Sequence, residues 1–251
     1  MWIFLLKCKS EAFEAFKRFK SLVENEVADK IKCFRIDRGG EFTSFDFKKL
    51  CDDEGVKRHL TTAYSPQQNG VVERRNQTVM EMARSLMKSK SVPAKFWGEA
   101  VKTSVYILNR APTKSVEGMT PYQAWYVKAP NMQHLRVLGC LAHNKVVSPH
   151  LTKLADRSIK TILLGYEEGS KAYRLLDPSR ERVVVSRDVV FEENKEWSWQ
   201  EGQDKEETNC GGTFIVSISE GETREGGAPS TPSSNEGGES ASPSTLLKTL
   251  T

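Results

Sequence analysis

The sequence lacks long hydrophobic runs. Its apolar opening, Trp2–Leu6, is only five residues long, whereas about 20 apolar residues are needed to cross a bilayer. No small-residue cleavage site follows it, so it does not have the form of a signal peptide. We interpret it as a buried strand, at least one of whose sheet partners would precede Met1. We expect an intracellular protein that does not associate with a membrane.

Cysteine pairs are missing as well. The five cysteines are Cys8, Cys33, Cys51, Cys140 and Cys210, and no two of them form a Cys-x-x-Cys metal or redox motif. Their odd number and wide spacing favour reduced thiols, and Cys33, Cys51 and Cys140 are interpreted as small buried side chains. The four histidines have no cysteine pair with which to complete a zinc site, so we predict no zinc.

Charge is unevenly spread along the chain. Residues 1–130 hold 23 Lys and Arg against 15 Asp and Glu, residues 131–200 hold 11 against 9, and residues 201–251 hold 3 against 9. The basic segment at residues 1–130 is compatible with a polyanionic partner, although an ordinary solvated surface could have the same charge. The acidic end is rich in Gly, Ser and Pro and cannot bury enough apolar area to offset its ordering entropy. This composition predicts a disordered linker.

One stretch, Ile36–Met87, carries the candidate chemistry. Asp37 ends an apolar-alternating run that predicts a strand, and it precedes the Gly39-Gly40 turn. Glu73 lies near the start of a long amphipathic helix, with 35 residues between the two carboxylates. Carboxylates at a strand end and a helix start can converge on Mg²⁺, which prefers oxygen ligands. Phosphoryl transfer uses such cations to activate the attacking oxygen.

Each carboxylate also has a plainer interpretation. Asp37 before two glycines could be a turn residue, because Asx turns are common. Glu73 could simply favour the helix dipole in a first turn. The spacing and the flanking residues together favour descent from a metal-dependent site over both alternatives.

Two motifs in this stretch resemble the integrase core of copia-type LTR retrotransposons. They are Asp37-Arg38-Gly39-Gly40-Glu41-Phe42 and Ser65-Pro66-Gln67-Gln68-Asn69-Gly70-Val71-Val72-Glu73-Arg74, and the likeness extends over about residues 2–193. The resemblance implies an incomplete RNase H-like α/β core with an Asp, Asp, Glu triad. Asp37 matches the second Asp and Glu73 the Glu, and both would be catalytic and bind Mg²⁺ or Mn²⁺. The first Asp of the family and its zinc-binding segment precede the part seen here.

The same resemblance implies DNA as the partner, both element ends and target, with a homo-multimeric intact parent and a nuclear location. Lys and Arg hold phosphates, and polar side chains can touch bases or sugars. The candidate DNA-binding residues are Gln67, Gln68, Asn69, Arg74, Arg75, Gln77 and Arg84. A solvated helix face and an ordinary polar loop remain the alternatives.

Hydrophobic periodicity predicts the elements around these motifs. Helices are expected from Ser10 to about Glu26, from Thr43 or Ser44 to Gly55, from Pro66 or Asn69 onward, from Val92-Pro93 to before Pro112, and from Thr120-Pro121 through Tyr126. Strands are expected at residues 31–36 and 56–60. On the long helix, Val72, Val79, Ala83 and Leu86 form the core stripe. Glu73, Gln77, Met80 and Arg84 lie about 100° around the helix from it, where an active-site face could be.

From about Leu135 the pattern becomes that of short β-strands. Strands are expected at residues 136–143 and 161–166, and residues 172–177 and 182–191 are expected to form a hairpin. Several short strands suggest a small barrel, and the resemblance implies an SH3-like β module. We therefore expect an integrase core over residues 1–130, an SH3-like module over 131–196 and a disordered acidic linker over 197–251.

Three hypotheses follow for function. The first is an integrase fragment whose intact parent joins DNA by metal-dependent strand transfer, and which is inactive alone because a metal ligand is missing. The second is a non-catalytic nucleic-acid-binding or assembly remnant of a decayed retroelement. The third is a fragment that does not fold stably.

Overall fold

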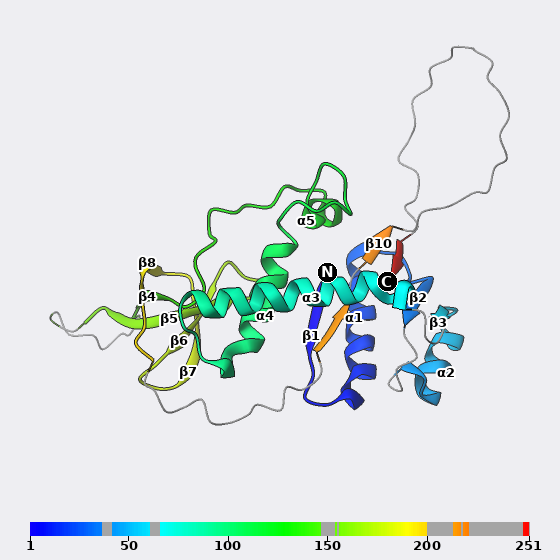
Figure 1. Ribbon diagram of the computed structural model, residues 1–251, viewed down its shortest axis with the longest axis horizontal. Helices are drawn as coiled ribbons and strands as arrows, with labels where there is room; N and C mark the ends of the chain where they lie inside the picture. The colour runs from blue at the N-terminus through cyan, green and yellow to red at the C-terminus, as the bar shows by residue number, and fades with distance from the viewer. Residues whose placement is uncertain are drawn as a thin grey trace, which may run out of the picture. The chain divides into compact units, whose positions relative to one another are not determined.

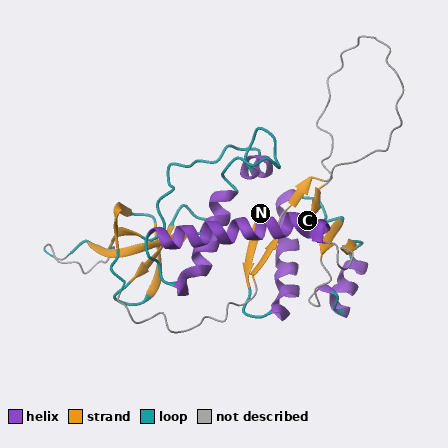
Figure 2. Ribbon diagram, in the orientation of Figure 1, coloured by secondary structure: helices purple, strands orange, loops and turns teal. Residues whose placement is uncertain are grey.

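The computed structural model describes residues 1–36, 42–60, 66–146, 154, 156–199, 213–216, 218–220 and 248–250, with the backbone alone for residues 60, 66–69 and 71 and for the last three ranges. The chain divides into two compact units, each described by itself. One contains Met1–Cys8 and Gly70–Ile215, and the other contains Lys9–Asn69 and Val216–Thr251. Both units mix helix and strand (Figures 1 and 2), which confirms the predicted α/β class.

The Lys9–Asn69 unit is built around a parallel strand pair. Strand β2 (Cys33–Ile36) pairs with β3 (Lys57–Leu60), and helix α2 (Phe45–Asp53) connects them, because parallel neighbours require a crossover. Ser44 caps α2, its hydroxyl accepting a hydrogen bond from the Phe47 backbone N–H at 3.3 Å. Gly55 follows the helix end at a φ of 68°, a conformation that glycine adopts without strain. Both predicted helix ends are confirmed.

Phenylalanine side chains form the core of this unit. Helix α1 (Ala12–Val27) contributes Phe16, whose ring centroid lies 4.7 Å from that of Phe34 on β2 and 5.0 Å from that of Phe47 on α2. Burying one such side chain stabilises a fold by about 1.5–3 kcal/mol. The helix predicted from Ser10 begins at Ala12 instead, because Ser10 lies inside a 3₁₀ turn, Lys9–Glu11, and Glu11 occupies the cap position.

Three short strands after residue 200 belong to a four-stranded sheet and a two-stranded sheet. Strand β11 (Lys248–Leu250) lies beside β2 and β10 (Ile218–Glu220) beside β11. Strand β9 (Thr213–Val216) pairs with β1 (Trp2–Leu5), and β1 is half-buried rather than buried as predicted. Most of the predicted linker, residues 197–251, lies outside the described residues.

The other unit contains α4 (Trp97–Leu108), α5 (Pro121–Tyr126) and, from Gly70 onward, α3 (Pro66–Ser89). Helix α3 begins at Pro66, which suits the first helical position because proline lacks the N–H that would be unpaired there. Of the two predicted starts, Pro66 is therefore right. Thr120 caps α5 as predicted, accepting from the Gln123 N–H at 3.1 Å.

Five antiparallel strands form the sheet of this unit, in the order β7-β6-β5-β4-β8. They are β4 (Cys140–Lys145), β5 (Ser158–Tyr166), β6 (Tyr173–Asp177), β7 (Arg182–Ser186) and β8 (Val189–Glu196). The predicted hairpin is confirmed by the pairing of β6 with β7, which ends at Asp177 and Arg182. The prediction that 182–191 is one strand is wrong: the chain leaves β7 and crosses to pair with β4 as β8, a long-range choice that local periodicity does not reveal.

Helix α4 packs closely against this sheet. The Thr103 hydroxyl donates a hydrogen bond to the Leu164 carbonyl oxygen at 3.3 Å. A Cβ atom on the next residue of β5, Gly165, would lie 2.7 Å from the same hydroxyl oxygen. Glycine is therefore needed here so that helix and strand can approach.

Candidate functional site

Helix α3 presents two different faces. Val79 and Ala83 are buried and pack with Ala100 and Val101 of α4, which confirms the central part of the predicted core stripe. The second predicted stripe is exposed throughout, and its members are Glu73, Gln77, Met80 and Arg84. The four share one side of the helix because they are spaced by four, three and four residues. The predicted position of this stripe beside the core is thus confirmed, and its role as an active-site face stays a prediction.

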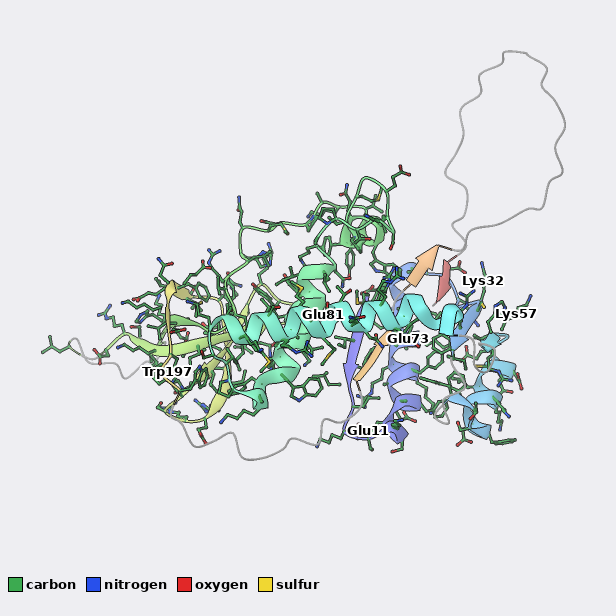
Figure 3. The ribbon with its side chains drawn as sticks, viewed as in Figure 1. Glu11, Lys32, Lys57, Glu73, Glu81 and Trp197 are labelled. Atoms are coloured by element: carbon green, nitrogen blue, oxygen red, sulfur yellow. The ribbon has the colours of Figure 1, made fainter. Side chains whose placement is uncertain are left out.

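Glu73 is an exposed carboxylate on this stripe (Figure 3). Within the part of the chain that the structure describes, no side chain forms a hydrogen bond or ion pair with it. Because α3 begins at Pro66, Glu73 lies beyond the first turn, where the attraction of the helix dipole for a carboxylate fades. The dipole interpretation therefore loses its basis, and the carboxylate oxygens are open to a cation.

The second predicted carboxylate, Asp37, lies outside the described residues, as does the rest of the 37–41 turn. Strand β2 ends at Ile36, immediately before Asp37, as predicted. Gln67, Gln68 and Asn69 belong to α3 by their backbone rather than to a polar loop. Their side chains are outside the description.

The basic candidates on α3 differ in surroundings. Arg74 is exposed, whereas Arg75 is half-buried and donates from Nη2 to the Ser115 hydroxyl oxygen at 3.3 Å. Burial lowers the pKa of Arg75. Gln77 donates from Nε2 to Oε1 of Glu81 at 2.8 Å, an i, i+4 contact along the helix. The structure therefore leaves Arg74 open to a ligand and gives Arg75 a structural contact.

The prediction of buried thiols is confirmed for two of the three cysteines. Cys51 and Cys140 are buried and Cys33 is half-buried. Burial raises the pKa of all three, that of Cys140 to about 11, so they stay protonated near neutral pH. Among the described residues no three His, Cys, Asp or Glu side chains gather as a metal cluster. A cation site on α3 would thus need ligands beyond those described.

Sequence reasoning missed the role of the arginine on β6 and a groove beside α3. Arg174 is held by two carboxylates, Glu99 and Glu167. Trp97 packs against the core and also lines a groove between α3 and α4. No local sequence pattern predicts the ion pairs of Arg174 or the groove, because each joins elements that are distant along the chain.

Within the described ranges, no helix combines the length and the hydropathy needed to cross a membrane. The family model described as "Retroviral polymerase SH3-like domain" matches residues 140–206. This range begins at β4 and includes all five strands of the antiparallel sheet. The match confirms the predicted SH3-like module.

Two plant proteins resemble most of the chain. It is 41% identical over 195 residues to the "Retrovirus-related Pol polyprotein from transposon TNT 1-94" of Nicotiana tabacum, a match covering 78% of this chain and 15% of that protein. It is 33% identical over 193 residues to the corresponding polyprotein from transposon RE1 of Arabidopsis thaliana, covering 77% and 13%. The chain therefore spans less than a sixth of the length of either relative.

Solved structures with some likeness come from retroviruses. One is the simian T-cell lymphotropic virus intasome in complex with PP2A regulatory subunit B56 gamma, at 16% identity and a TM-score of 0.40, covering 71% of this chain and 61% of that chain. Another is the HTLV-2 integrase catalytic core domain in complex with magnesium, at 20% identity and a TM-score of 0.37, covering 48% and 71%. By its homology to the plant polyproteins, the chain belongs to the copia-type retrovirus-related Pol polyproteins, of which it is a segment.

Proposed function

We propose that this segment serves DNA integration by holding DNA and a divalent cation against the exposed face of α3. The observation that carries the proposal is Glu73, an exposed carboxylate without a partner among the described residues. It shares its side of the helix with Gln77 and Arg84. A carboxylate beside cationic and amide groups suits a metal ion and a phosphate backbone together.

Hard oxygen donors fit Mg²⁺ or Mn²⁺, and Glu73 offers two of them. In our proposal Asp37 supplies the second carboxylate ligand, and the cation, when bound, would polarise a phosphodiester and its attacking oxygen. The integrase core of HTLV-2, solved with magnesium, supports the choice of cation. Arg74 and Arg84 hold phosphates, and Gln67, Gln68 and Asn69 contact bases or sugars.

The remaining expectations from the family stand as parts of the same proposal. They are a homo-multimeric parent, a nuclear location, and the division into a core over residues 1–130, an SH3-like module over 131–196 and a linker over 197–251. Helices α3 to α5 and the five-stranded sheet fall in one compact unit, so the proposed boundary near residue 130 separates functions rather than folding units.

Metal binding is the direct test. We expect Mn²⁺, which is paramagnetic, to broaden the backbone NMR signals around residue 73, and Mg²⁺ to compete with it. Glu73→Gln and Asp37→Asn should each abolish the broadening, whereas Glu117→Gln, a change at an exposed carboxylate on a loop, should leave it unchanged. Broadening that survives Glu73→Gln would refute the proposed ligand.

A second candidate function is metal-independent DNA binding. It is favoured by the exposed cations Arg74 and Arg84, which can hold phosphates without a metal ion. DNA affinity that is equal with and without Mg²⁺, and unaffected by Glu73→Gln and Asp37→Asn, would support it. A strand-transfer assay completes the comparison, because joined product from the isolated chain would contradict the expectation that it is inactive alone.

A further inference from the structure

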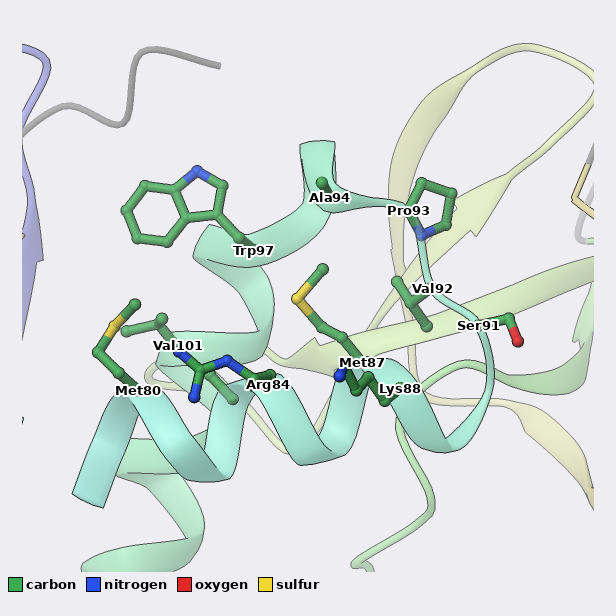
Figure 4. A pocket seen from close by; sticks show the side chains of 11 residues that line it. Met80, Arg84, Met87, Lys88, Ser91, Val92, Pro93, Ala94, Trp97 and Val101 are labelled. Carbon is green, nitrogen blue, oxygen red and sulfur yellow. The ribbon is translucent and has the colours of Figure 1, made fainter. Parts of the chain in front are cut away.

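A groove of about 500 Å³ lies between the second half of α3 and the start of α4. Its floor is apolar, with Met80 and Met87 from α3 and Trp97 and Val101 from α4. Figure 4 shows Met87 reaching from α3 toward the segment that carries Trp97. Grooves of this size and lining bind small organic groups rather than bare ions.

Two positively charged side chains line the groove. Arg84 and Lys88 line it and are exposed, and an i, i+4 pair brings their side chains next to each other on the helix. Neither forms an ion pair with another described residue, and the described lining contains no Asp or Glu. The groove therefore suits a ligand with a flat apolar part and a neighbouring negative charge.

The groove continues the face of α3 that carries Glu73. Met80 and Arg84 belong both to the exposed stripe and to the groove lining. At a rise of about 1.5 Å per residue, they lie about 10 and 16 Å along the helix from Glu73. With a spacing of about 3.4 Å per nucleotide in one strand of a duplex, this corresponds to roughly three to five nucleotides.

We propose that the groove binds an unpaired nucleotide of a DNA strand lying along α3. The base stacks between Met87 and Trp97, and Arg84 and Lys88 hold the adjoining phosphates. Only an unpaired base can enter, because a base inside a duplex is covered on both faces and paired at its edge. Stacking on aromatic side chains next to a basic track is the usual way in which single strands are bound. The path of the strand rests on the proposed function, whereas the chemistry of the groove does not.

The first test compares two DNA ends with the same phosphates. Fluorescence anisotropy of the full chain, without divalent cations, measures its affinity for a duplex with a three-nucleotide single-stranded end and for the same duplex with abasic sugars at that end. We expect the normal end to bind at least about fivefold tighter, the effect of one stacked base. Equal affinities would overturn the proposal.

Variants then locate the effect. Met87→Ala should abolish the difference between normal and abasic ends, and Met119→Ala, a change at an exposed methionine outside the groove lining, should preserve it.

Arg84→Gln with Lys88→Gln should weaken binding of both ends about tenfold at low salt, because lost phosphate contacts do not depend on the base. Lys102→Gln with Lys114→Gln removes two exposed lysines outside the lining and should weaken binding less. A base effect that survives Met87→Ala would place the site elsewhere.

Two further outcomes separate this proposal from its alternatives. The first uses an acidic tryptophan peptide, Glu-Glu-Trp-Glu-Glu. If this peptide binds through Arg84 and Lys88 and the single-stranded end does not bind, the groove is a site for a protein partner and the proposal is overturned. Glu73→Gln should remove Mn²⁺ binding but keep the preference for a normal end. If Mn²⁺ binding fails in the unaltered chain and this preference remains, the proposed function fails and the groove assignment stands.

Discussion

Arg174 on β6 and Glu99 on α4 form a two-pronged ion pair. Nε of Arg174 lies 3.0 Å from Oε2 of Glu99 and Nη2 lies 2.8 Å from Oε1, while Nη1 donates to Glu167 at 2.9 Å. Only the planar guanidinium offers this fork of donors. The Arg174 and Glu99 side chains are 25% and 19% exposed, so the pair links helix to sheet at a half-buried position. These hydrogen bonds raise the pKa of Arg174.

Removing one partner of this pair should destabilise the unit. We expect Glu99→Gln to lower the free energy of unfolding by about 1–3 kcal/mol, because it leaves a half-buried guanidinium with weaker partners. All five tryptophans lie in Met1–Cys8 or Gly70–Ile215, so urea denaturation followed by tryptophan fluorescence reports this unit. Arg180→Gln is the control: its side chain is 60% exposed and 3.9 Å from Asp177, and it should change stability by less than about 0.5 kcal/mol.

Two glycines should respond to alanine in opposite directions. At Gly165 a Cβ atom would lie 2.7 Å from the Thr103 hydroxyl oxygen, and Gly165→Ala should cost about 1–3 kcal/mol through overpacking. Gly70 lies in α3, and outside its chain neighbours and the helix's own backbone no described atom comes within 4 Å of an added Cβ. Gly70→Ala should stabilise the helix by up to about 1 kcal/mol. The same fluorescence-detected urea curves measure both changes, and a shared sign would contradict the packing argument.

His134 should make the stability of this unit depend on pH. Burial, with help from Arg110 and Arg136, lowers the pKa of His134, and its Nε2 lies 2.7 Å from the Tyr106 hydroxyl oxygen. The unfolded chain titrates near about 6.5, so just below that pH the unfolded state binds more protons than the folded one. The free energy of unfolding should therefore rise with pH through this window and level off above it.

Urea curves between about pH 5 and 7 check this sign against the linkage relation. His134→Gln, which cannot take up the proton, should show a smaller slope than the unaltered chain. NMR titration of the His134 ring should give a pKa below the ordinary value. A pKa above about 6.5 would reverse the expected slope and refute the account.

Neighbouring arginines on α3 should separate binding from stability. Arg74 is exposed, and Arg74→Gln should reduce DNA affinity and lower the salt dependence of binding by about one counterion, with little change in unfolding. Arg75 is half-buried and bonded to Ser115, so Arg75→Gln should lower the free energy of unfolding by about 1 kcal/mol. Salt-dependent anisotropy and urea denaturation distinguish the two. Identical effects of both variants would contradict the difference in environment.

Helix α3 shows why part of the site followed from sequence. The core positions Val79 and Ala83 and the exposed positions Glu73, Gln77 and Arg84 follow from a period of 3.6 residues, and Pro66 marks the helix start. The different fates of Arg74 and Arg75 did not follow, because the contact of Arg75 with Ser115 joins residues 40 positions apart. Local patterns contain no information about such a contact.

The sequence by itself contained the family motifs. It also determined the mixed α/β class, the faces of α3 and most helix ends, because periodicity, caps and turn residues act between near neighbours. Only the tertiary structure decided that β8 leaves its neighbour β7 to pair with β4. It likewise decided that Arg174 is bound to Glu99 rather than open to a ligand, and that Met87 and Trp97 share a groove. These features depend on packing between segments far apart in the chain, where the free energy gained comes from complementary surfaces rather than from local preference.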